Sequence, residues 1–117
     1  MNLDKFNVCV ISHRRPLNVS KMNKCVNVPL NWYVGDKKDK DDYETDVIVG
    51  GNLCESRNKI LKDSWKQDKI AVMIDDDIKG LKECYIDNGK KTTRNITLTE
   101  AIDIMYRSLN STRLKLA

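Results

Sequence analysis

Residues 69–78 read KIAVMIDDDI, and this stretch decides the fold. The five apolar residues 70–74 show no alternation with polar residues, which is typical of a strand covered on both faces in a parallel sheet. Three aspartates, Asp75, Asp76 and Asp77, follow at once. Ligands of open parallel sheets bind beyond the carboxyl ends of the strands. The stretch therefore predicts a buried strand whose ligand-binding end carries three carboxylates.

Similar apolar runs on the N-terminal side of this strand predict the rest of an open, mostly parallel α/β sheet with flanking helices, a Rossmann-like arrangement. Capping-box pairs, Asn52 with Glu55 and Thr97 with Glu100, mark the starts of two helices. We expect the charged run 36–46 to be loop and 87–95 to be a polar turn. The expected strands are 6–12, 31–35, 46–50, 69–74 and 79–86, and the expected helices follow residue 16 to about 27, begin near 52, and run from 97 to about 109.

Helical spacing assigns inner faces to two of these helices. In the helix that begins near residue 52, Cys54, Ile60, Leu61 and Trp65 are expected to share one apolar face. The last helix is expected to be amphipathic, with an apolar face formed by Leu98, Ala101, Ile102, Met105 and Leu109.

The composition fits one globular domain spanning residues 1–117. The net charge of +4 comes from basic and acidic residues that are interspersed, which permits only a weak attraction to polyanions. No secretory signal and no segment long enough to cross a bilayer is recognisable, so we expect a cytoplasmic protein with no membrane partner. Accordingly, the four widely spaced cysteines are expected to be free thiols in the core: Cys9, Cys25, Cys54 and Cys84.

Three consecutive carboxylates repel one another, and a cation or a set of hydrogen-bond donors compensates such repulsion. Mg²⁺ and Mn²⁺ prefer oxygen ligands and bind through one or two carboxylates together with substrate phosphates. Asp75 and Asp77 are therefore candidate metal ligands for a diphosphate. A guanidinium from the basic turn at Arg14 and Arg15 would suit the same diphosphate, and Arg14 is the candidate site residue; the alternative is a solvated basic loop. The competing interpretation of the triplet is a solvated acidic turn or a helix cap.

Four motifs together resemble the GT-A fold of family 2 glycosyltransferases: SHRRP at 12–16, NWYVGD at 31–36, GGNLCESRNKIL at 50–61 and KIAVMIDDDI at 69–78. The similarity covers residues 6 to about 86 and looks closest to small bacteriophage glycosyltransferase domains. It implies that the chain binds a nucleotide-diphosphate sugar such as a UDP-sugar, with Mn²⁺ or Mg²⁺, in the host cytoplasm if a phage encodes it.

The resemblance also implies roles for individual residues. The Ser12-His13 turn would meet the nucleoside, Asp36 would approach the uracil or ribose, and Arg57 would contact the base or diphosphate. Asp75 would bond the ribose or support the metal, and Asp77 would be the direct metal ligand. Asp76 would belong to the same nucleotide-sugar site.

The sequence departs from the family beyond the aspartates. The acceptor site and catalytic carboxylate of inverting family members lie well downstream, and only about forty residues follow Asp77 here. We identify no catalytic base, and we expect an enzyme or half-enzyme that transfers a sugar to an acceptor, for which a modified DNA base is one candidate. The alternative is a non-catalytic nucleotide- or metal-binding module. An uncovered sheet edge would favour a homodimer or a partner subunit.

Overall fold

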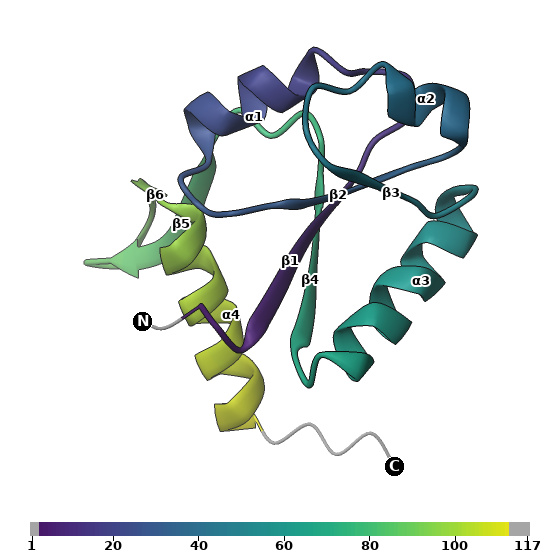
Figure 1. Ribbon diagram of the computed structural model, residues 1–117. Coiled ribbons are helices and arrows are strands. Elements are labelled where there is room, and N and C mark those ends of the chain that lie inside the picture. The colour runs from purple at the N-terminus through teal and green to yellow at the C-terminus, as the bar shows by residue number, and fades with distance from the viewer. Residues whose placement is uncertain (1–2, 113–117) are drawn as a thin grey trace.

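The computed structural model describes residues 3–112 and contains one four-stranded sheet, one hairpin and four helices within that range (Figure 1). In chain order the elements are β1 (Phe6–Ile11), α1 (Asn18–Cys25), β2 (Asn31–Val34), α2 (Lys37–Asp41), β3 (Val47–Val49), α3 (Leu53–Lys66), β4 (Ile70–Asp75), β5 (Leu81–Asp87), β6 (Lys90–Ile96) and α4 (Leu98–Thr112).

The main sheet has the strand order β3-β2-β1-β4, and all its pairs are parallel. This confirms the predicted α/β class with a parallel sheet and flanking helices. The central strand β1 pairs with β2 on one side and with β4 on the other. Because every side chain from Phe6 to Val10 is buried, β1 forms the middle of the core.

Helices cover the two faces of the sheet (Figure 1). On one face, Val8 and Val10 pack into a large cluster with Met22 of α1 and Ile102 of α4. The opposite face carries a smaller cluster in which Cys9 and Tyr33 lie against Ile60 of α3. Alternate residues of β1 therefore serve different helices, as the two-residue repeat of a strand requires.

Polar contacts fix α3 to the sheet. The Asn7 side-chain amide donates to Ser64 Oγ at 2.9 Å, and the Tyr33 hydroxyl donates to Asp63 Oδ2 at 2.7 Å. Burial and the hydrogen bond to Asp63 raise the pKa of Tyr33 well above its ordinary value. Burial likewise raises the pKa of the Cys9 thiol to about 12, with Asp63 adding to the rise.

The predicted apolar face of α3 was largely wrong. Ile60 is buried, but Cys54 and Leu61 are exposed, and Trp65 is 86% exposed. The helix instead buries the small polar residues Ser56 and Ser64 beside Ile60. Small side chains let a helix lie close to a sheet, and the apolar pattern alone does not reveal such a contact.

The charged run 36–46 is not simply loop, because it contains α2. Asp36 caps this short helix by accepting a hydrogen bond from the Asp39 backbone N–H at 2.8 Å. Two side chains of the run, Asp39 and Tyr43, are buried, although we expected the run to stay in water. The Tyr43 ring anchors the segment, and the buried Asp39 accepts a hydrogen bond from the Arg14 backbone N–H, while the other charged side chains of the run are exposed.

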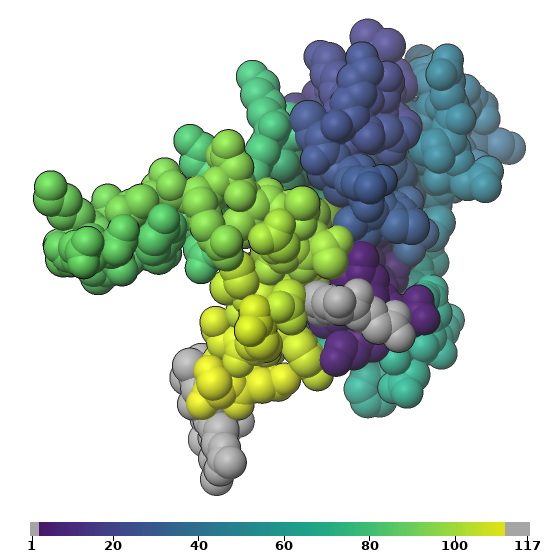
Figure 2. Space-filling model, turned by 90° about the vertical axis from the view of Figure 1, so that its left-hand side faces the viewer, coloured from purple at the N-terminus to yellow at the C-terminus, as the bar shows by residue number. Residues whose placement is uncertain are grey.

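The region expected to be a polar turn, 87–95, is mostly strand. β5 and β6 pair antiparallel around a two-residue turn, in which Asn88 and Gly89 both have positive φ. Such turns match the twist of the adjoining strands. The hairpin is a separate two-stranded sheet, and Figure 2 shows it projecting from the body of the molecule.

Two expectations about burial also fail. β4 was predicted to be buried, but it is an edge strand of the main sheet, and Ile70 and Met73 are 42% and 37% exposed. On α4, Leu98 and Ile102 are buried, whereas Met105 and Leu109 are exposed.

All four cysteines are free, as predicted, but only Cys9 lies in the core. Cys25, Cys54 and Cys84 are exposed, contrary to the expectation that they would be buried. Among residues 3–112, no helix has the length and apolar character needed to span a membrane.

Candidate functional site

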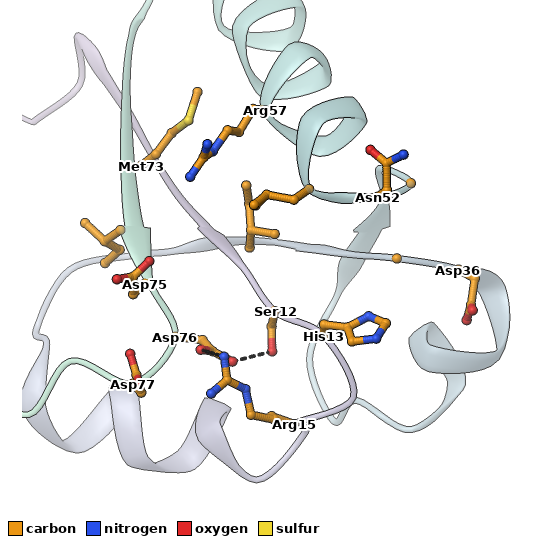
Figure 3. Close-up of a pocket in the computed structure, with 15 residues that line it drawn as sticks. Ser12, His13, Arg15, Asp36, Asn52, Arg57, Met73, Asp75, Asp76 and Asp77 are labelled. Atoms are coloured by element: carbon orange, nitrogen blue, oxygen red, sulfur yellow. Dashed lines mark hydrogen bonds and ion pairs between the residues drawn. The ribbon is translucent and has the colours of Figure 1, made fainter.

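A cleft of about 780 Å³ lies at the carboxyl ends of β1, β2 and β4, where parallel sheets commonly bind ligands. Its size is within the range of small-molecule sites. It brings together most of the residues that the sequence singled out, because each follows a strand or opens a helix at this end of the sheet (Figure 3). The predicted site residues that line it are Ser12, His13, Asp36, Arg57, Asp75, Asp76 and Asp77.

The three aspartates differ in their surroundings. Asp76 is 1% exposed, and both its carboxylate oxygens have partners: Oδ1 lies 2.6 Å from Arg15 Nη2, and Oδ2 accepts from Ser12 Oγ at 2.8 Å. The side chains of Asp75 and Asp77 line the cleft without a hydrogen bond or ion pair to any other residue in the described part of the chain. Asp76 therefore acts as an internal brace, and its two neighbours are available to a ligand.

A directional hydrogen-bond chain holds this end of the sheet together. The Arg15 backbone N–H donates to the Tyr43 hydroxyl at 3.2 Å, and that hydroxyl contacts Ser12 Oγ. Because Ser12 donates its own proton to Asp76, the Tyr43 hydroxyl donates to Ser12. The side chain of Ser12 is therefore committed to the protein, and its role in the cleft is to shape the wall.

The opposite wall of the cleft comes from the start of α3. Arg57 projects from the first turns of this helix toward Met73 of β4 (Figure 3). Asn52 caps the helix, and its capping box with Glu55 is complete. Gly51 precedes it with φ of 98°, a conformation that favours glycine. The positive end of the helix dipole thus lies beside an arginine in the same cleft, an arrangement suited to an anion.

His13 and Asp36 lie at the far end of the cleft from the aspartates (Figure 3). The His13 ring lies so close to Gly35 that a β-carbon there would be 3.3 Å from Nδ1. Asp36 uses Oδ1 to cap α2, so its second oxygen remains for other partners. Both residues line the cleft, as the sequence predicted.

Arg14 was expected in the site and lies outside the cleft. Its backbone has φ of 53°, which turns the residue away, and its N–H donates to Asp39 Oδ2 at 2.9 Å. Arg14 lines a smaller hollow of about 250 Å³ beside α2. Arg15, the next residue, lines the cleft instead. The RR pair signalled a cation here, but sequence alone could not show which arginine the turn directs inward.

The acidic wall offers a limited set of metal ligands. Within residues 3–112, no group of three or more His, Cys, Asp or Glu side chains is arranged to hold a metal ion. A cation at Asp75 and Asp77 would therefore need oxygens from a ligand or from water. This fits Mg²⁺ and Mn²⁺, which commonly bind one or two carboxylates together with phosphate oxygens.

The cleft thus combines the free carboxylates of Asp75 and Asp77 with two arginines, a helix N-terminus and a histidine. Comparisons with protein-family models, with curated proteins and with solved structures gave no match. Any assignment of function therefore depends on the chemistry of this cleft and on the motifs that form it.

Proposed function

We propose that this chain is a glycosyltransferase-type domain that binds a nucleotide-diphosphate sugar, of the UDP class, together with Mn²⁺ or Mg²⁺. One observation carries the proposal. The free carboxylates of Asp75 and Asp77 share a cleft with Arg57 and the N-terminus of α3. A metal diphosphate needs both signs of charge at once, because its cation seeks oxygen ligands and its phosphates seek donors.

Different cleft residues would bind different parts of the ligand. Asp75 and Asp77 would hold the cation, which neutralises charge on the departing diphosphate. Arg57 and the first amides of α3 would bind the phosphate oxygens that face the helix. His13 and Asp36, at the other end of the cleft, would contact the nucleoside. Arg15 remains half-exposed beside its partner Asp76 and offers a further guanidinium edge to the diphosphate.

The transfer step requires an acceptor held in line and a base for its proton. No cleft residue is identified as that base. We therefore expect donor binding, slow hydrolysis of the donor, and weak transfer to acceptors such as a modified DNA base. A binding module without catalysis remains the alternative outcome, and incubation with Mn²⁺, labelled UDP-sugars and DNA distinguishes the two by whether labelled product forms.

Thermal unfolding with UDP tests the binding site directly. With Mn²⁺ present, UDP at a hundred times its dissociation constant should stabilise the fold by about 2.7 kcal/mol. In EDTA the stabilisation should largely disappear, because the bare carboxylates repel the diphosphate. Asp77→Asn should remove the metal-dependent part. Asp87→Asn, an exposed aspartate on the hairpin, is the matched control and should behave as wild type.

A second pair of variants tests the phosphate side. In Mn²⁺, Arg57→Ala should weaken UDP binding, whereas Lys62→Ala, which removes an exposed cation farther along the same helix, should not. Equal stabilisation by UDP in EDTA and in Mn²⁺ would remove the metal from the proposal. Unchanged binding in Arg57→Ala would remove the phosphate assignment.

A further inference from the structure

Both edge strands of the main sheet, β3 and β4, lack an outer partner within the described residues, and β4 is the longer of the two. The Ile70 backbone N–H donates to the Lys5 carbonyl at 2.8 Å, so the polar backbone groups of Ile70 point toward β1. These groups alternate sides along a strand. The N–H and C=O groups of Ala71 and Met73 therefore point outward, where no strand of the described chain pairs with them.

Apolar side chains border this edge. Ile70 and Met73 of β4 are themselves partly exposed. On α3, the exposed residues Leu61 and Trp65 follow Arg57 at four-residue spacing, and Arg57 faces Met73 in the cleft. Unpaired backbone groups beside exposed apolar side chains favour pairing with another strand.

The sequence of the edge is complementary to itself. When residues 69–75 are set antiparallel to a second copy and centred on Val72, Lys69 stands opposite Asp75, Ile70 opposite Ile74 and Ala71 opposite Met73. Each cationic end therefore meets an anionic end, and every apolar residue meets another. Lys69 and Asp75 are both exposed and available for such a pair.

We infer that β4 pairs antiparallel with β4 of a second copy, about a two-fold axis at Val72. In this register the outward groups of Ala71 meet those of Met73 in the other copy, so both residues exchange hydrogen bonds. Lys69 contributes through its side chain, because its backbone N–H already donates to the Ser64 carbonyl. The axis also brings Leu61 and Trp65 of both copies to the same side of the joined sheet, where they cover one another.

The dimer connects assembly to the cleft. Asp75 lines the cleft, and the opposing Lys69 of the second copy would lie across the edge from it. Each cleft would therefore gain a cationic neighbour that the single chain does not provide. Because Asp75 is also proposed to hold a cation, the dimer is measured in EDTA, where this carboxylate is free to pair with Lys69 of the second copy.

Sedimentation velocity tests the charge register. Wild type should dimerise with a dissociation constant on the order of 10 µM, as expected for a small interface. Lys69→Glu and Asp75→Lys should each weaken the dimer about tenfold, because two symmetric pairs turn from attraction to repulsion. Combining both changes should restore the wild-type value. Lys62→Glu, the same charge change on an exposed position of α3, should have little effect.

Cysteine crosslinking tests the position of the axis. In a background with the three exposed cysteines changed to serine, Val72→Cys should form a disulfide-linked dimer under mild oxidation, because residues at the axis lie directly opposite each other. Ile70→Cys is the control: its counterpart stands opposite Ile74, so it should not crosslink alone. Two results would overturn the inference. The first is a wild-type protein that stays monomeric at about 100 µM, and the second is equal crosslinking at positions 70 and 72.

Discussion

Replacing Arg15 by alanine should expose how strongly Asp76 depends on its cation. The carboxylate is 1% exposed, and its partners are Arg15 at 2.6 Å and Ser12 at 2.8 Å. Removing one partner of a buried ion pair typically costs about 3–5 kcal/mol. The Arg15 side chain is 54% exposed, so water screens the pair, and we expect about 2–3 kcal/mol. For a chain of this length the midpoint of thermal unfolding should fall by about 8–12 °C.

A second substitution distinguishes this cause from simple loss of packing. Asp76→Asn removes the buried charge but keeps an oxygen that can accept from Ser12. In the Arg15→Ala background it should therefore restore about 1 kcal/mol, although in wild type it should destabilise. Urea unfolding of the four proteins measures the cycle. A double variant less stable than Arg15→Ala alone would refute the argument that an unpaired buried carboxylate causes the loss.

Three further results are expected. A thiol reagent should modify the three exposed cysteines in the native protein and Cys9 only on unfolding. Folding raises the pKa of Cys9 from 9.0 to about 12, so the stability that its neutral thiol contributes should be complete below pH 9 and be lost as the pH rises toward 12, at up to about 1.4 kcal/mol per pH unit. Cys9→Val should remove this part of the pH dependence in urea unfolding. Gly51→Ala should destabilise the fold by about 1–3 kcal/mol in the same assay, because φ of Gly51 is 98° and the new β-carbon would lie 2.9 Å from Glu55. Gly80 has open space around it, so the control Gly80→Ala should change stability by less than about 0.5 kcal/mol. Asp63→Ala should cost about 1–3 kcal/mol by leaving the buried Tyr33 hydroxyl without its acceptor, and adding Tyr33→Phe should recover part of this loss, which the double-variant cycle would measure.

Apolar runs were sufficient to predict the four strands of the main sheet and its parallel class. They were sufficient because most residues of a strand buried on both faces are apolar, as in β1, where Asn7 is the one polar residue and donates to Ser64. They misjudged β4, whose composition is that of an inner strand although its outer edge is uncovered. Composition reports what the faces of a strand contact, and it carries no information about the neighbour along the sheet.

The cleft was partly predictable because residues at strand ends share one edge in a parallel sheet. On that basis the sequence predicted one shared cleft for four residues that do line it: Asp75, Asp77, Arg57 and His13. The choice between Arg14 and Arg15 depended on a positive φ in the turn, which the residue types do not announce. The sequence also did not reveal the hydrogen bond between the Tyr43 hydroxyl and Ser12, because it joins a buried ring in a charged run to a serine at the end of a strand.

The central position of β1 has a consequence for synthesis of the chain. β1 pairs with β4 along its whole length, and Ser12 and Asp76, which bond to each other, are 64 residues apart. At about 5–20 residues per second, a ribosome needs about 3–13 s to make the intervening segment. During that time the edge of β1, the strand with the most buried residues, has no partner on the β4 side. Slower translation would lengthen this interval, and a nascent chain paused before residue 70 should be the species that binds chaperones most strongly.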